Sequence, residues 1–181
     1  MKATGIVRRI DDLGRVVIPK EIRRTFRIRE ADPLEIFTTR EGEIILKKYS
    51  PLGEMSTFAK QYAESLAQVS GHIAVIADRD QIVAVSGGMR ILISKNITKA
   101  LETVMENRDC ILASREDRAF IKLAEEMSEE CEQEAICPIL CEGDVIGAVA
   151  LLATENKERM GEVEKKLVQS AAGFLGRQME Q

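Results

Sequence analysis

The sequence has few aromatic residues, a single histidine and no long hydrophobic run. It contains no tryptophan, two tyrosines and five phenylalanines among its 181 residues, and the one histidine is His72. No apolar stretch approaches the ~20 residues that a membrane-spanning helix needs. The first residues also show no secretory apolar core. We therefore expect a protein that has no membrane partner and stays in the cytoplasm.

Cysteine is present but lacks the spacing of a metal site. The four cysteines are Cys110, Cys131, Cys137 and Cys141. If Cys137 and Cys141 share a strand, they lie roughly 13 Å apart on one face, which is too far to bind the same ion. In a reducing cytoplasm we expect four free thiols that pack as small hydrophobic side chains. The sequence predicts no metal and no cofactor.

The net charge of −4 is unevenly distributed. Residues 1–50 contain 12 Lys/Arg and 8 Asp/Glu, whereas the rest of the chain contains 14 Lys/Arg and 22 Asp/Glu. The first 29 residues alone hold 9 basic and 3 acidic residues. This asymmetry indicates an anionic partner for the N-terminal part.

The first 50 residues have the pattern of short strands around one short helix. Their β-branched residues predict strands at 6–10 and 15–18, and Pro19 suits the first turn of a helix that ends at Phe26. A hairpin of residues 34–37 and 43–46 is predicted around Gly42. Fifty residues cover too little apolar surface for an independent core, so we expect two copies to share one.

A short linker at residues 51–56 is expected to lead into an α/β domain at residues 57–181. Apolar spacing predicts helices at 54–70, 96–105, 115–134 and 161–179. Hairpins are predicted from residues 72–77 with 81–86, and from residues 135–141 with 145–153.

The first and last of these helices carry more apolar surface than one sheet can cover. Their candidate oligomerisation residues are Phe58, Tyr62, Leu66, Leu167 and Phe174. Two self-associating surfaces of two-fold type predict a homotetramer, with one dimer contact in the N-terminal domain and one between the helices. The alternative is that both helices pack entirely within one chain.

Basic side chains of the N-terminal domain form the candidate DNA-binding surface. Strand alternation sends neighbouring arginines to opposite faces, and positions four apart on a helix share a face. Guanidinium groups suit phosphates and guanine edges of double-stranded DNA. The candidates are Arg8, Arg9, Arg15, Lys20, Arg23 and Arg24. The alternative is a solvated basic face that pairs with nearby carboxylates.

The segment Leu13-Gly14-Arg15-Val16-Val17-Ile18-Pro19 closely resembles the AbrB family of transition-state regulators. The resemblance implies an α+β protein with an AbrB-like swapped-hairpin β-barrel over residues 1–50, dimeric and followed by a GAF-like sensor domain. Ala31 stands where relatives have glycine before Asp-Pro, which changes a turn and not the DNA face. The family's DNA-binding arginines correspond to Arg8, Arg9, Arg15, Arg23 and Arg24.

Over its full length the chain is similar to sporulation regulators of this family. The resemblance implies a sequence-specific regulator that activates and represses late sporulation genes, associated with the nucleoid of the forespore. GAF domains often bind small molecules, and an unidentified ligand could contact Ser86, Gly87 and Gly88. An ordinary glycine loop is the alternative interpretation of that segment.

Two other functional classes are weighed against this interpretation. The same barrel serves in antitoxins, but those usually end in an extended acidic tail, whereas this C-terminal part has regular helix and strand periodicity. An enzyme is the other class. The sequence has no Ser/His/Asp order and no phosphate-binding glycine loop, so we predict that it is not an enzyme.

Overall fold

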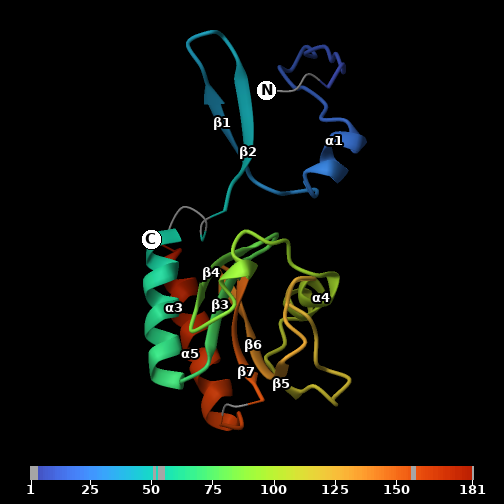
Figure 1. Cartoon of the computed structure of the whole chain (residues 1–181). Coiled ribbons are helices and arrows are strands. Elements are labelled where there is room, and N and C mark those ends of the chain that lie inside the picture. The colour runs from blue at the N-terminus through green and yellow to red at the C-terminus, as the bar shows by residue number, and fades with distance from the viewer. Residues whose placement is uncertain (1–3, 51, 53–55, 156–157, 181) are drawn as a thin grey trace. The chain divides into compact units, whose positions relative to one another are not determined.

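The computed structural model describes residues 4–50, 52, 56–155 and 158–180 (Figure 1). The chain divides into two compact units, Met1–Tyr49 and Ser50–Gln181, called unit 1 and unit 2 below.

Unit 1 contains one short helix and one hairpin. Helix α1 (Lys20–Thr25) begins after Pro19, and strands β1 (Leu34–Thr38) and β2 (Ile44–Lys48) pair in antiparallel register. The β1–β2 turn closes with the Gly42 N–H donating to the Thr39 carbonyl, and Gly42 has a φ of 81° that suits glycine. The predicted helix and hairpin are therefore confirmed.

The strands predicted at residues 6–10 and 15–18 are absent from the described part of unit 1, so that prediction is wrong for the single chain. A β-strand needs a partner strand to satisfy its backbone groups. No other strand of unit 1 pairs with these residues, because β1 and β2 pair only with each other.

Among the described residues of unit 1, no hydrophobic side chain is buried. Large hydrophobic side chains stay exposed, including Val7 at 87%, Val17 at 73% and Ile44 at 70%. Phe26, the C-cap residue of α1, is 62% exposed. Unit 1 thus has secondary structure without a core of its own.

Unit 2 is built on a five-stranded antiparallel sheet with strand order β4-β3-β7-β6-β5. The strands are β3 (Ile73–Asp78), β4 (Ile82–Ser86), β5 (Ile111–Ser114), β6 (Cys131–Cys141) and β7 (Asp144–Thr154). Both predicted hairpins are present, as β3–β4 and β6–β7, whereas the short edge strand β5 was not predicted.

Helices cover both faces of this sheet (Figure 1). Helices α3 (Ser56–Ser70) and α5 (Glu162–Gln178) pack on one face over an apolar cluster that includes Leu151. The other face carries a second cluster with Leu152, covered by α4 (Lys99–Asn107) and a short 3₁₀ turn, η1 (Arg90–Leu92). Leu52, inside the expected linker, is fully buried in the first cluster.

Helix α5 lies directly against the sheet because it carries glycine at the point of contact. A Cβ at Gly176 would meet the Leu140 carbonyl oxygen at 2.0 Å, so no side chain fits there. The approach buries Val168, Ala172 and Leu175 of α5. Other residues of α5, such as Val163 and Phe174, stay exposed.

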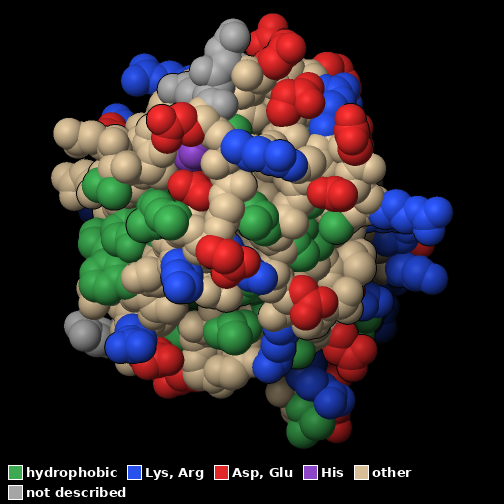
Figure 2. All heavy atoms as spheres, turned by 90° about the horizontal axis from the view of Figure 1, so that it is seen from below, with side chains coloured by type: hydrophobic (Ala, Val, Ile, Leu, Met, Phe, Trp, Pro, Cys, Tyr) green, Lys and Arg blue, Asp and Glu red, His purple; other side chains and the backbone are tan. Residues whose placement is uncertain are grey.

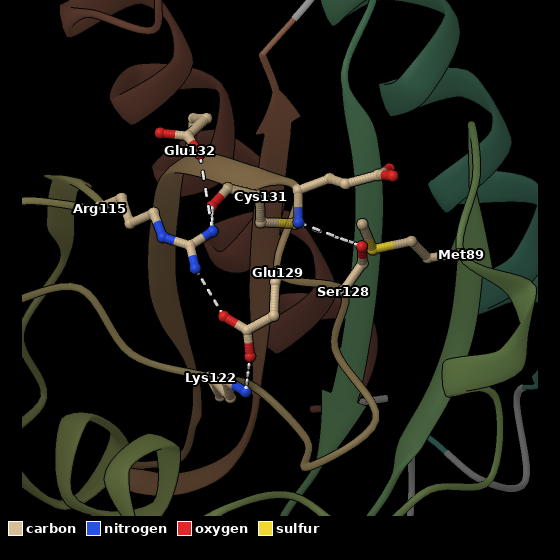
Figure 3. A network of polar contacts seen from close by, with 8 residues as sticks. Met89, Arg115, Lys122, Ser128, Glu129, Cys131 and Glu132 are labelled. Atoms are coloured by element: carbon tan, nitrogen blue, oxygen red, sulfur yellow. Dashed lines mark hydrogen bonds and ion pairs between the residues drawn. The ribbon is translucent and has the colours of Figure 1, made fainter.

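The segment between β5 and β6 is irregular, so the helix predicted at residues 115–134 is wrong. Its apolar side chains Phe120, Leu123 and Met127 still pack against the sheet. Charged side chains hold its two ends together: Arg115 contacts Glu129 at 2.6 Å and Glu132 at 3.6 Å, and Lys122 also pairs with Glu129 (Figure 3). Core packing and ion pairs therefore order this segment without a helix.

Two cysteines form a disulfide, which corrects the expectation of four free thiols. Cys110 and Cys137 are bonded, and their Cα atoms lie 4.3 Å apart. The β5–β6 register pairs Ile111 with Ile136, which places Cys110 opposite Cys137. The two residues are 27 positions apart in sequence, so only the strand register reveals their proximity. Cys131 and Cys141 are free.

Candidate DNA-binding surface

Helix α1 presents three of the candidate DNA-binding cations. Lys20, Arg23 and Arg24 are all exposed on this six-residue helix. Its acidic residue Glu21 lies in the first turn, while the two arginines lie in the last turn, as suits the helix dipole. The outer surface of α1 is therefore mainly cationic.

The C-terminal end of α1 is anchored to the hairpin. The Lys48 ammonium of β2 donates to the Arg27 carbonyl at 3.0 Å and pairs with the Asp32 carboxylate at 3.2 Å. Asp32 is almost fully buried and also accepts the Arg29 N–H at 2.8 Å. These contacts fix the C-terminal end of α1 against β2 of the hairpin.

Arg15 is positioned by a tight turn at residues 11–15. The Asp11 carboxylate accepts the backbone N–H groups of Leu13 and Arg15, and Arg15 Nε donates to it at 2.7 Å. These hydrogen bonds, the Arg15 backbone N–H first, lower the pKa of Asp11. The Arg15 side chain is still 69% exposed, so it remains available to an anion.

Arg8 and Arg9 are also exposed, but the described residues around them form no strand. Their predicted alternation between two faces is therefore not established in the single chain. The Arg15–Asp11 pair is a contact of the kind that the alternative interpretation, a basic face paired with nearby carboxylates, predicts. Asp11 begins an Asp-Asp-Leu-Gly turn, in which Asp side chains commonly accept hydrogen bonds from backbone groups two residues ahead.

The glycines of the candidate ligand segment have a structural explanation. A Cβ at Gly87 would meet the His72 carbonyl oxygen at 2.8 Å, and one at Gly88 would meet Ile73 at 3.0 Å. Gly87 also has a φ of 83°. Close packing against His72 and the start of β3 therefore accounts for both glycines, while Ser86 ends β4 as a half-buried residue.

The candidate oligomerisation residues separate into two groups. Phe58, Tyr62 and Phe174 form an aromatic cluster between α3 and α5, with the Tyr62 and Phe174 rings stacked at 5.4 Å. Phe174 is 43% exposed, and Leu167 is partly buried beside the core. Leu66 is only 7% exposed and packs inside unit 2, so it is not available to a second chain.

Hydrophobic side chains also gather on the outside of unit 2. Figure 2 shows a patch on the side where Figure 1 places α3 and α5. The exposed side chains of these two helices include Val69 at 72% and Val163 at 66%. We refer to Val69, Val163 and Phe174 as the apolar helix surface.

Glu134 of β6 is a buried carboxylic acid that sequence reasoning missed. It is fully buried on the sheet face of the second cluster, opposite Leu152. Its Oε1 accepts the Ile121 N–H at 2.7 Å, and Oε2 has no hydrogen-bond partner among the described residues. Burial raises the pKa of Glu134 to about 8, against a weaker lowering by the Ile121 hydrogen bond.

Two further results bear on binding. None of the helices in the described part of the chain is long and apolar enough to cross a membrane. Within the same residues, no group of three or more His, Cys, Asp or Glu side chains could hold a metal ion.

The chain matches two family models. One, described as the C-terminal part of stage V sporulation protein T, a transcription factor, matches residues 54–180. The other, described as antidote-toxin recognition MazE, a bacterial antitoxin, matches residues 7–53.

Similar proteins cover both units. Stage V sporulation protein T of Bacillus subtilis (strain 168) is 54% identical over 182 residues, 100% of both chains. Transition state regulatory protein AbrB of the same organism is 39% identical over 108 residues, which are 60% of this chain and 93% of that protein. The GAF domain of an Acinetobacter phosphoenolpyruvate-protein phosphotransferase covers 74% of this chain and 84% of its own, with a TM-score of 0.56 and 12% identity.

These matches confirm the AbrB-family resemblance and the GAF fold. The full-length match and the family model over residues 54–180 confirm the predicted class of transcription regulator. The chain belongs to the stage V sporulation protein T family of DNA-binding transcription regulators.

Proposed function

We propose that this protein binds double-stranded DNA through paired copies of unit 1 and regulates late sporulation genes, activating some promoters and repressing others. The main support is that the six candidate cations are all exposed on a unit that has no core of its own. The regulator acts in the cytoplasm, on the nucleoid of the forespore, and it catalyses no reaction.

The exposed hydrophobic residues of unit 1 support its pairing. Val7, Val17 and Ile44 would each gain about 1.5–3 kcal/mol from full burial. A second copy supplies the strand partners that residues 6–10 and 15–18 lack within one chain. Pairing also doubles the number of arginines that face DNA and gives the two-fold symmetry of a palindromic site.

DNA binding is tested with Arg24→Ala and Arg15→Ala in the full chain. Each loses a guanidinium from the proposed surface, so affinity for a target duplex should fall by about 1–3 kcal/mol. Thermal unfolding should change little, because both side chains are exposed. Fluorescence anisotropy with a labelled duplex measures the binding.

Arg40→Ala is the matched control, because it removes the same charge from an exposed position in the β1–β2 turn. It should bind DNA as the unaltered chain does. With ~6–10 phosphate contacts, affinity should also fall ~10³–10⁵-fold between low and moderate salt. An affinity for DNA that does not change with salt concentration would contradict the proposed surface. Equal losses of affinity in all three variants would contradict it as well.

We further propose that the apolar helix surface joins two such dimers into a tetramer. Val69, Val163 and Phe174 are exposed on α3 and α5, Phe174 within the aromatic cluster, and a second copy would cover them. Two contacts of two-fold type on one chain close into a tetramer without forming a filament.

Phe174→Asp tests the tetramer by placing a charge inside this contact. Light scattering at micromolar concentration should show a tetramer for the unaltered chain and a dimer for the variant. Gln169→Asp, on an exposed part of α5, should remain a tetramer. If the unaltered chain were itself a dimer, the proposed contact through the apolar helix surface would be refuted.

Unit 2 is proposed to adjust DNA binding in response to an unidentified small molecule, as sensor domains of the GAF fold do. The match of residues 7–53 to an antitoxin model leaves a second reading for unit 1. The folded unit 2 and its own transcription-factor model favour regulation. A small toxin that copurifies in stoichiometric amount would favour the antitoxin.

A further inference from the structure

The Cys110–Cys137 disulfide joins an edge strand to the interior of the sheet. Cys110 immediately precedes β5, which pairs with β6 alone, while Cys137 lies in the middle of β6. Their Cα separation of 4.3 Å is close to that of directly opposed residues in an antiparallel pair. The bond therefore adds a covalent crosslink beside the four residue pairs that hold β5.

The two sulfurs differ in accessibility. Cys137 is 7% exposed and packs in the cluster beneath α3 and α5, whereas Cys110 is half-buried at the sheet edge. An external thiolate would thus reach Cys110 first. Cys131 is a poor target for such a thiolate, because it is 1% exposed and burial raises its pKa to about 12.

A DNA-binding regulator works where cellular thiols keep most cysteines reduced, and disulfides found there are usually transient or redox-sensing. We propose that Cys110 and Cys137 form a reversible redox site that locks β5 onto the sheet when oxidised and frees it when reduced. The partners are low-molecular-weight thiols and their disulfides, or a dithiol reductase.

The exchange is balanced for atoms and electrons. A thiolate R–S⁻ attacks the Cys110 sulfur, the Cys110–Cys137 bond breaks, and Cys137 leaves as a thiolate that takes up a proton. A second R–S⁻ then attacks the mixed disulfide, giving R–S–S–R and the Cys110 thiol after protonation. Two electrons pass from two thiols to the protein, and the reverse reaction with R–S–S–R restores the bond.

Reduction should act on a defined region. The segment from α4 to β5 reaches the sheet through Cys110, and Arg108, which caps α4, donates to the Gly143 carbonyl at 2.7 Å. Without the crosslink, β5 depends on its pairing with β6 and on the half-buried side chains Ile111 and Leu112. The amides of residues 111–114 should then exchange faster with solvent.

The test uses the full chain in buffers of reduced and oxidised glutathione. Samples are quenched by alkylation under unfolding conditions, and mass spectrometry counts the blocked thiols. Oxidised protein should show two, Cys131 and Cys141, and reduced protein four. Hydrogen exchange of residues 111–114 should be about tenfold faster after reduction, as expected when a local opening becomes easier.

Cys110→Ser should give the fast exchange in both buffers, and Cys141→Ser should keep the redox response. Cys110 is half-buried at the edge, so this variant disturbs the core less than Cys137→Ser would. The reversible change in hydrogen exchange on reduction and reoxidation of the unaltered chain tests the proposal without any substitution. A bond that never forms, that glutathione cannot reduce in the folded protein, or that leaves exchange at residues 111–114 unchanged would overturn the proposal.

Discussion

In unit 1, Val7, Val17 and Ile44 are at least 70% exposed, and none of the described hydrophobic side chains is buried. In unit 2, a single sheet separates two apolar clusters, and side chains such as Ile136, Leu151 and Leu152 are fully buried. One part of the chain thus completes its core alone, and the other does not. The part without a core is the one that carries the candidate DNA-binding cations.

Under the proposed pairing of unit 1, this difference would make DNA binding depend on self-association. If unit 1 acquires its core only by pairing, its cations reach their final positions only in the dimer. Unit 2 has two apolar clusters of its own, so in the proposed tetramer it would hold copies together before DNA is bound. A substitution that prevents the pairing of unit 1 but leaves unit 2 folded tests whether the two units differ in this way.

The largest effect is expected from Val17→Asp. Val17 is 73% exposed in the single chain, where a charge would cost little, but in the proposed dimer the charge would be buried. Pairing of unit 1 should weaken by about 2–4 kcal/mol, roughly a hundredfold in affinity. In a Phe174→Asp background, sedimentation velocity should show a monomer in place of a dimer.

Val17→Ile is the matched control, because it keeps an apolar β-branched side chain and should remain dimeric. The unfolding transition of unit 2 should be the same in both variants. A Val17→Asp protein that still sediments as a dimer would mean that the exposed residues of unit 1 do not form a shared core.

A smaller effect, confined to unit 2, is expected from Glu134→Gln. The folded-state pKa of Glu134, about 8, lies above its ordinary value, so the folded protein holds this proton more tightly than the unfolded chain. Stability from the native residue should therefore fall as pH rises from about 4.5 to about 8, and then level off. Glutamine has no such titration and can still accept the Ile121 N–H.

The variant should match the native protein near pH 4.5 and exceed it by about 1–3 kcal/mol at pH 8. Denaturant unfolding at several pH values measures the difference. Glu130→Gln on the surface is the control and should show no comparable pH dependence. Parallel stability curves for the native and Glu134→Gln proteins would show that the carboxyl is not buried as described.

Local periodicity was enough to predict α3, α5 and the two hairpins of unit 2, because each depends on residues a few positions apart. It failed where a distant contact decides. Phe120, Leu123 and Met127 have helical spacing but pack on the sheet from an irregular segment. The Cys110–Cys137 bond depends on the β5–β6 register, which sequence spacing does not show.

The candidate site was predicted to a similar degree. The cationic residues follow from composition and from the AbrB-like motif, and all six are exposed. Leu66 was assigned to a contact between chains, although it packs within unit 2. A helix pattern shows which face is apolar, but not whether the covering surface belongs to the same chain.

The smallest effect concerns Ala31, where the AbrB-family resemblance led us to expect glycine. Ala31 has a φ of 64°, a left-handed conformation that costs a residue with a Cβ about 1–2 kcal/mol. Ala31→Gly removes this strain, while the greater freedom of glycine in the unfolded chain offsets part of the gain. Unit 1 should be stabilised by about 0.5–1 kcal/mol, seen as a higher unfolding midpoint for unit 1 and an unchanged one for unit 2.

Thr38→Gly in the extended strand β1 should lower the unfolding midpoint of unit 1, because no strain is relieved there. If both substitutions lowered it, the turn at Ala31 would not be strained in solution, and the alanine would be as well suited to this position as glycine.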